Sequence, residues 1–283
     1  MMQQAFLVYL FSKDEFAGST GSYDSGDDMK KKTANRILFI LSAAVFVCAV
    51  FYIGFCFYNQ FKAEREYETT SAPPVITTQE KNPPVFNPVD FPALVQKNDE
   101  IYAWIKIEHT NVDYPIAQHS GEDDFYLTHS AVDKSYLKSG AIYTEKCNAK
   151  DFSDPVTLIY GHNNYGDTMF TTLHKFEDEA FFAENEYFYI YMPQRRLTYQ
   201  IVSAFKYDDR HIMLSNDFSD KNRISAFQQM IQNPQSAQKN VRTEPDVPLN
   251  EHSRIVVLST CVTGDKTSRY LVCAVLVSDE KTN

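Results

Sequence analysis

The sequence lacks the charge balance and the ligand clusters that mark several classes of protein. Its 283 residues include 27 Lys and Arg against 37 Asp and Glu, which gives a formal net charge of −10 at neutral pH. Nucleic-acid-binding proteins usually carry a basic face that neutralises phosphates, so we expect no nucleic-acid partner. No group of Cys and His residues has the spacing of a zinc site, and we expect no metal.

Cysteine is scarce, and its number is odd. The chain has five cysteines, which are Cys48, Cys56, Cys147, Cys261 and Cys273. The first two lie in an apolar stretch, so three remain for the folded part. Three cysteines form at most one disulfide and leave at least one thiol free. A free thiol is either a buried, inert side chain or a reactive nucleophile.

Charged residues are missing from residues 37–58, which read ILFILSAAVFVCAVFYIGFCFY. A hydrocarbon core of about 30 Å is spanned by about 20 apolar residues in an α-helix, so this stretch predicts a single transmembrane helix. A cleaved signal peptide is the alternative. Its apolar core is usually shorter, about 7–15 residues, and a small-residue cleavage site follows it. Here the chain continues into NQFKAEREYE without such a site.

Basic residues directly before the span predict its orientation. They are Lys30, Lys31, Lys32 and Arg36. Such residues stay on the cytoplasmic side, so we expect a single-pass protein of the cell membrane with a cytoplasmic tail at residues 1–36 and the rest outside the cell. Residues 1–28 precede Met29 and contain a low-complexity run. They are either an over-extended reading frame or a short disordered tail.

Proline is concentrated after the span. Residues 69–90 carry Pro73, Pro74, Pro83, Pro84 and Pro88. Such a stretch cannot continue a helix and favours extended conformations. We therefore predict an extracellular stalk at residues 59–90 and a folded domain at residues 91–283.

The folded domain is predicted to be mainly β. Short apolar or alternating runs rich in Val, Ile, Tyr and Phe predict strands at 101–107, 156–161, 187–192, 197–205, 254–260 and 269–277. Helical spacing predicts helices at about 168–183 and about 219–232, the second with Ser219 as its N-cap. A β-barrel or sandwich with peripheral helices fits this pattern.

Three residues at strand ends suggest nucleophilic chemistry. Cys261 ends one apolar run, and Arg269 opens the next run eight positions later. If the two runs pair as neighbouring strands, the sulfur and the guanidinium face the same pocket mouth. A thiol needs a nearby base or cation, and His162 follows the strand-like VTLIYG. An Arg donor can stabilise an oxyanion. The alternative makes Cys261 a packing residue and Arg269 a charged strand-opener. His174 is expected only to solvate a helix.

The combination of LSTC (258–261), the following Arg269 and the upstream YGH (160–162) resembles the signature of the sortases, which are Gram-positive surface enzymes. The resemblance covers about residues 90–278. Segments 91–118, 124–129 and 169–176 are similar to the class B branch, and so is the helix predicted at about 219–232. The resemblance implies an eight-stranded sortase β-barrel with peripheral helices, preceded by the transmembrane helix.

The resemblance also implies a function. Cys261 would be the nucleophile, His162 the proton-transfer partner and Arg269 the oxyanion stabiliser. Ser259 and Thr260 would line the groove that binds a sorting signal, unless they only make local hydrogen bonds. The enzyme would cleave surface proteins between Thr and Gly of a C-terminal sorting signal and join the Thr to a peptidoglycan amine, without a cofactor. A hydrolysing cysteine protease and a non-catalytic, stalked surface-binding module remain the alternatives.

Overall fold

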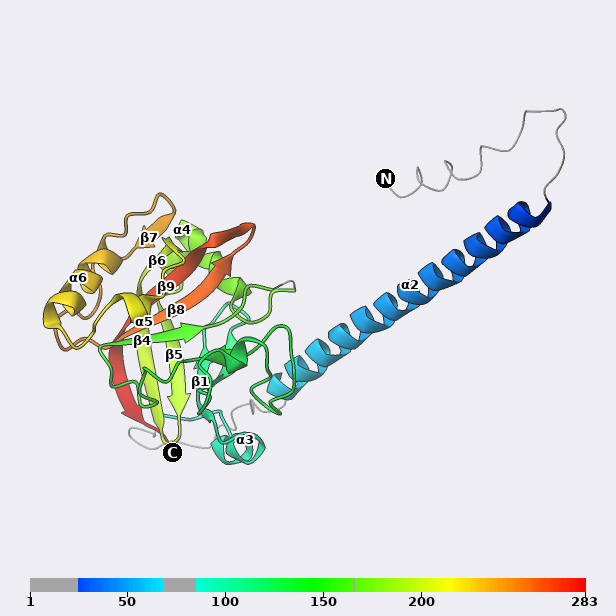
Figure 1. Cartoon of the computed structure of the whole chain (residues 1–283). Coiled ribbons are helices and arrows are strands. Elements are labelled where there is room, and N and C mark those ends of the chain that lie inside the picture. The colour runs from blue at the N-terminus through cyan, green and yellow to red at the C-terminus, as the bar shows by residue number, and fades with distance from the viewer. Residues whose placement is uncertain (1–24, 69–84, 165) are drawn as a thin grey trace. The chain divides into compact units, whose positions relative to one another are not determined.

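A computed structural model of the chain describes residues 25–68, 85–164 and 166–283 (Figure 1). Most of residues 1–28, and residues 69–84 of the predicted stalk, lie outside these ranges. The chain divides into two compact units, Met1–Gly54 and Phe55–Asn283, and each is described by itself.

The N-terminal helix is α2 (Ser25–Glu68), 44 residues long. Its stretch Arg36–Lys62 contains an 18-residue segment with a mean hydropathy of 2.6, and none of that segment is buried. The helix is therefore long and apolar enough to cross a membrane. It extends beyond the predicted span on both sides, so residues 59–68 of the predicted stalk are helical.

The C-terminal unit is built around a closed β-sheet. Its strands are β1 (Ile101–Lys106), β2 (Asp113–Ala117), β3 (Ile142–Tyr143), β4 (Val156–Tyr160), β5 (Tyr187–Met192), β6 (Arg195–Asp208), β7 (Lys239–Val241), β8 (Ile255–Val262) and β9 (Asp265–Lys281). They follow the order β5-β1-β2-β3-β4-β8-β9-β6-β7, and β5 also pairs with β6. That pairing closes eight strands into a barrel, with β7 added along β6. The predicted eight-stranded barrel is confirmed.

One helix of the C-terminal unit precedes β1, and the others lie between strands along the chain. These helices are α3 (Phe91–Lys97), the 3₁₀ helices η1 (Phe125–Leu127) and η2 (Thr171–Glu177), α4 (Glu179–Glu184), α5 (Ile212–Ser215) and α6 (Lys221–Gln232).

Both predicted helices differ from the structure in detail. The helix predicted at 168–183 is two elements, because Asp178 ends η2 and its carboxylate caps α4 by accepting from Phe181 N at 2.8 Å. The second helix begins at Lys221, and its N-cap is Asp220. The predicted cap, Ser219, instead donates its hydroxyl to Asp217.

The chain packs against the barrel before Phe91. Val85 forms a parallel bridge with Thr282, and Asn87 Nδ2 donates to the carbonyl of Met192 at 2.9 Å. Val89 is buried in the core. Residues 85–90 of the predicted stalk therefore contact the folded domain.

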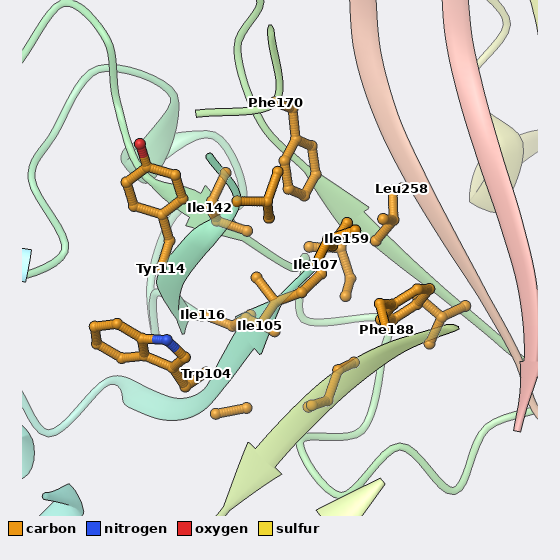
Figure 2. Close-up of a cluster of buried hydrophobic side chains, with 14 of the residues drawn as sticks. Trp104, Ile105, Ile107, Tyr114, Ile116, Ile142, Ile159, Phe170, Phe188 and Leu258 are labelled. Atoms are coloured by element: carbon orange, nitrogen blue, oxygen red, sulfur yellow. The ribbon is translucent and has the colours of Figure 1, made fainter. Parts of the chain in front are cut away.

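The central strands are covered on both faces, and their side chains alternate between two apolar clusters. Ile159, Leu258 and Val272 belong to the barrel interior, where Figure 2 shows Ile159 and Leu258 near Phe188. Their neighbours Leu158 and Val257 belong to an outer cluster that contains Phe227 and Ile231 of α6. Alternation is the rule for a strand, and strands buried on both faces give continuous apolar runs.

A buried carboxylate joins the segment before β1 to η1. Glu100 accepts from the hydroxyl of Tyr126 at 2.6 Å, from Ser120 N at 2.8 Å and from Lys134 Nζ at 2.9 Å. Burial by itself raises the pKa of Glu100, but these hydrogen bonds outweigh it and lower the pKa to about 2. The ionised carboxylate therefore stabilises the native state, and with it the position of η1.

Replacing Glu100 with Gln should change how stability depends on pH. A carboxyl with a lowered native pKa stabilises above its ordinary pKa, and this contribution is lost as pH falls from about 5 to about 2. Glu100→Gln should be less stable than wild type at neutral pH, and the gap should narrow in acid. Thermal unfolding followed by circular dichroism at several pH values measures this. Glu184→Gln, at an exposed position, is the control. A stability difference between wild type and Glu100→Gln that does not change with pH would contradict the lowered pKa of Glu100.

Candidate active site

Strand register brings three predicted residues to neighbouring positions. β4 and β8 pair in parallel with Tyr160 opposite Ser259, and β8 and β9 pair antiparallel with Cys261 opposite Arg269. His162 comes two residues after Tyr160 of β4, and Cys261 comes two residues after Ser259 of β8. Neighbouring strands lie about 4.8 Å apart. Cys261 is thus placed between His162 and Arg269 at one end of the barrel.

The same alternation sets the face on which these residues lie. Leu158, Tyr160, Ser259, Arg269 and Leu271 together line one pocket on the outer face. Cys261 is two residues beyond Ser259, so the period of two places it on this face as well. The hypothesis that the two apolar runs pair as neighbouring strands is confirmed, and the reading of Arg269 as a strand-opener alone does not account for its place in the pocket.

The three thiols of the barrel differ in exposure. Cys147 and Cys261 are exposed, whereas Cys273 is buried. Burial raises the pKa of Cys273 to about 12. The pKa of Cys147 is raised to about 11 by partial desolvation of its sulfur and by the nearby carboxylates of Glu145 and Asp123. Because the thiolate is the reactive form, Cys147 and Cys273 are poor nucleophiles at neutral pH.

His162 has a fixed orientation. Its Nε2 lies 2.8 Å from the carbonyl oxygen of Leu127, which can only accept, so Nε2 carries a proton. The other nitrogen, Nδ1, is left to exchange a proton with a reacting group. Gly161 brings the histidine close to the core, because a Cβ there would lie 2.5 Å from the side chain of Ile142 and 2.6 Å from that of Phe170.

Arg269 is anchored at one end of its guanidinium. Nη1 donates to the carbonyl oxygens of Ser268 at 3.0 Å and Lys266 at 3.3 Å. A guanidinium has five N–H donors in a rigid plane, and these two bonds use only Nη1. No described residue accepts from Nε or Nη2, so these donors are left for a ligand in the pocket that Arg269 lines.

Ser259 and Thr260 lie on opposite faces of β8. Ser259 lines the outer pocket. Thr260 pairs with Tyr270, which belongs to the interior cluster, and is only 2% exposed. The prediction that both residues line one groove is therefore corrected: consecutive residues of a strand point to opposite faces, and only Ser259 faces the pocket.

The pocket beside Arg269 is open to solvent, and about 400 Å³ of space lies between its walls when that solvent is included. Its wall is the segment after β6, with His211 and Ile212 at the start of α5. His211 Nδ1 accepts from Leu214 N at 3.2 Å, so Nε2 can donate to Glu145 Oε1 at 2.8 Å. Burial and the carboxylate of Glu145 raise the pKa of Tyr160 above its usual range. The pocket therefore combines the apolar side chains of Leu158, Ile212 and Leu271 with polar or charged ones from Asp209, Arg210, His211, Ser259 and Arg269.

Two residues missed by sequence reasoning hold the end of β8. His174 was expected only to solvate a helix, and this is wrong. Its Nε2 lies 3.0 Å from the carbonyl oxygen of Cys261, and its Nδ1 lies 2.5 Å from Glu177 Oε1. Asn163 Nδ2 donates to the same Cys261 carbonyl at 2.9 Å. No local pattern marks these contacts.

Comparisons with known proteins agree with this geometry. The family model of the sortase domain matches residues 105–277. Sortase B of Listeria monocytogenes is 28% identical over 170 residues, which cover 60% of this chain and 66% of that protein, just under two thirds of its length.

Solved structures are similar too. The X-ray structure of Clostridium perfringens sortase B has a TM-score of 0.60 and 29% identity, covering 67% of this chain and 100% of that one. The crystal structure of sortase B from Bacillus anthracis has a TM-score of 0.63 and 26% identity, covering 79% and 99%.

The inward orientation of Thr260 can be tested by an isosteric substitution. Its hydroxyl is buried and has no hydrogen-bond partner among the described residues, and an unpaired buried hydroxyl costs about 1–3 kcal/mol. Thr260→Val should therefore raise the free energy of unfolding by about 1 kcal/mol and leave the rate of Cys261 alkylation unchanged. Urea unfolding and alkylation with iodoacetamide measure the two effects.

Thr144→Val is the matched control. The hydroxyl of Thr144 bonds with Tyr102 at 2.8 Å and with Gln118 at 3.2 Å, so the same chemical change should destabilise the protein there. A loss of stability or slower alkylation in Thr260→Val would place the hydroxyl in the site after all.

Proposed function

The chain belongs to the sortase family, in its class B branch, and we propose that it is a membrane-anchored transpeptidase in which Cys261, His162 and Arg269 form the catalytic group. Sortases are cysteine transpeptidases that act on surface proteins. The observation that carries the proposal is the register that sets Cys261 opposite Arg269 on β9 and next to the end of β4.

The first half of the reaction forms a thioester. The thiolate of Cys261 attacks the carbonyl carbon of the Thr in a sorting signal, and the developing oxyanion is stabilised by the unused N–H groups of Arg269. As the intermediate collapses, the Thr–Gly bond breaks. His162 Nδ1 gives a proton to the departing Gly amine, while Leu127 keeps Nε2 in place.

The second half transfers the acyl group. An amine of the cell-wall peptidoglycan attacks the thioester carbonyl, His162 takes the proton of the attacking amine, and the Cys261 thiolate leaves. The new bond is an amide between the Thr and the cell wall. Every step uses a side chain of this site, and none needs a metal or an organic cofactor.

The outer-face pocket suits the sorting signal. It lies directly beside Cys261 along β8, with Ser259 in its floor and Arg269 at its edge. A peptide that lies there presents its carbonyl to both the sulfur and the guanidinium. Asp209, Arg210 and His211 line the same pocket and offer polar groups to a side chain of that peptide.

The helix α2 is the proposed anchor. Its apolar stretch has the length of a membrane span, and basic residues precede that stretch. The proposed order is a cytoplasmic tail at residues 1–36, a membrane helix at 37–58, an extracellular connection at 59–90 and the catalytic domain at 91–283. The connection is helical as far as Glu68 and packs on the barrel from Val85. This order places the site outside the cell, where surface proteins and peptidoglycan are found.

One assay separates this function from its two alternatives. The full chain in detergent is incubated with a peptide that carries a Thr–Gly sorting signal, together with an added amine, and the products are identified by mass spectrometry. Ligation of the amine to the Thr supports the transpeptidase. Cleavage without ligation would make the protein a protease, and no turnover would favour a non-catalytic surface module.

Replacing Cys261 with Ala should abolish turnover in this assay, because it removes the nucleophile and little volume. The circular dichroism spectrum should stay that of the wild type, since the side chain is exposed. Cys147→Ala and Cys273→Ala serve as controls and should keep the activity. Substantial turnover in Cys261→Ala, or its loss in Cys147→Ala, would assign the nucleophile elsewhere.

Arg269 tests whether geometry or charge alone stabilises the oxyanion. Losing one oxyanion donor typically costs about 10²–10³-fold in rate, so Arg269→Ala should lose about that much in kcat. Arg269→Lys should recover only a small part, because an ammonium is a hydrated point charge rather than a planar fork. Steady-state kcat and KM on one peptide give the answer. A folded Arg269→Lys enzyme with wild-type kcat would contradict the geometric role of the guanidinium and show that Arg269 contributes only its positive charge.

A further inference from the structure

The regular pairing of β8 breaks directly after the proposed nucleophile. The register to β9 shifts between Cys261 and Val262, where the chain turns into the hairpin. At this break, side chains contact the carbonyl oxygen of Cys261. Asn163 Nδ2 lies 2.9 Å from it and also 2.9 Å from the hydroxyl of Thr263. The two hydrogens of this amide nitrogen are shared among these two oxygens and Nε2 of His174, 3.1 Å away.

His174 approaches the same carbonyl from η2. Its Nε2 is 3.0 Å from the Cys261 oxygen and 3.1 Å from Asn163 Nδ2. Its Nδ1 is 2.5 Å from Glu177 Oε1. A carboxylate only accepts hydrogen bonds, so Nδ1 carries the proton and the ring has one orientation. With the ring proton on Nδ1, Nε2 is an acceptor, so it accepts from Asn163 Nδ2 and holds that amide against the Cys261 carbonyl.

This second histidine is not placed to act on the sulfur. Its ring stacks on Tyr270 with centroids 4.9 Å apart, and Tyr270 belongs to the interior cluster. Cys261 faces the outer side, with His162 and Arg269. His174 therefore contacts the backbone of Cys261 from the interior side of the sheet, while His162 is the histidine on the side of the thiol.

Asn163 connects this contact to the proposed catalytic pair, because it directly follows His162 in the chain. The ends of β4 and β8 are thus joined by one amide side chain, which His174 and Glu177 hold in place. Reacting groups must be positioned closely, and a misplacement of about 1 Å can cost about 10²-fold in rate. The distance between the Cys261 sulfur and the His162 ring depends on this link.

We propose that Asn163, His174 and Glu177 form a positioning triad that holds Cys261 at reacting distance from His162. The inference rests on the proposed function for its catalytic consequence. The triad does not touch the substrate. It fixes the backbone of the nucleophile, so its loss should slow the chemical steps and leave peptide binding largely intact.

The first test compares kcat and KM of the full chain in detergent for His174→Ala and Asn163→Asp. The second change keeps the shape of the side chain but replaces the N–H donors with an acceptor that faces the Cys261 carbonyl. Both variants should lose roughly 10- to 100-fold in kcat, while KM stays within about twofold. Wild-type kcat in a folded variant, or a loss confined to KM, would overturn the proposal.

The second test uses Glu177, where a conservative substitution should preserve the activity that an Ala substitution removes. Glu177→Gln still offers a carbonyl oxygen to His174 Nδ1–H and should keep most of the activity, whereas Glu177→Ala should behave like His174→Ala. Lys175→Ala is the matched control in the same 3₁₀ helix, because Lys175 Nζ donates to the carbonyl of His109 at 2.9 Å and makes no contact with β8. An equal loss of kcat in Lys175→Ala would contradict the proposal, because it would show that the substitutions act only by destabilising η2.

A third readout does not depend on the substrate. Alkylation of Cys261 by iodoacetamide at neutral pH, followed by peptide mass mapping, reports how well His162 can take the proton of the thiol. It should slow about tenfold in His174→Ala and Asn163→Asp and stay unchanged in Lys175→Ala. If the wild type ligated no sorting-signal peptide, the proposed function would fail while this series still tested the triad. Wild-type alkylation in both variants would overturn the triad itself.

Discussion

The site depends on the register of one strand between two unlike neighbours. β8 runs parallel to β4 on one edge and antiparallel to β9 on the other. A shift of β8 by one residue would turn Cys261 into the barrel, because a strand repeats every two residues. The apolar alternation prevents this shift. Val256 and Leu258 fill the interior while Ile255 and Val257 contact the outer cluster, so the burial that stabilises the barrel also places the thiol.

The two faces of this sheet carry different parts of the site. The outer face carries the exposed thiol, the guanidinium and the pocket, where a substrate has access. The interior side and the loops at the barrel end position them. Glu100 binds Tyr126 of η1, and the next residue, Leu127, fixes His162 through its carbonyl. Asn163 donates to the carbonyl of Cys261, and His174 accepts from Asn163. Each proposed catalytic residue is thus tied to the scaffold through a backbone carbonyl, which belongs to another residue for His162 and Arg269 and to Cys261 itself for the thiol.

Sequence reasoning succeeded where a single element carries its own signal. The run YFYIYM predicts β5 with the bounds found in the structure, since a strand in the barrel wall is dense in β-branched and aromatic residues. β2 contains Pro115, and β3 has only two residues, so neither shows a recognisable period. The positions of Cys261, His162 and Arg269 followed from motifs at strand ends. The role of His174 did not, because its contact with Cys261 joins residues 87 positions apart and has no local pattern.

The central claim is that Cys261 forms the thioester while Arg269 faces the oxygen of the attacked carbonyl. A crystal structure of the chain bound to a sorting-signal peptide, with a thiol-reactive carbonyl in place of the scissile one, tests it most directly. The account predicts a covalent bond to Cys261 Sγ, the former carbonyl oxygen within hydrogen-bond distance of the Arg269 guanidinium, and the peptide in the outer-face pocket. A bond to another cysteine, or an oxygen turned away from Arg269, would contradict it.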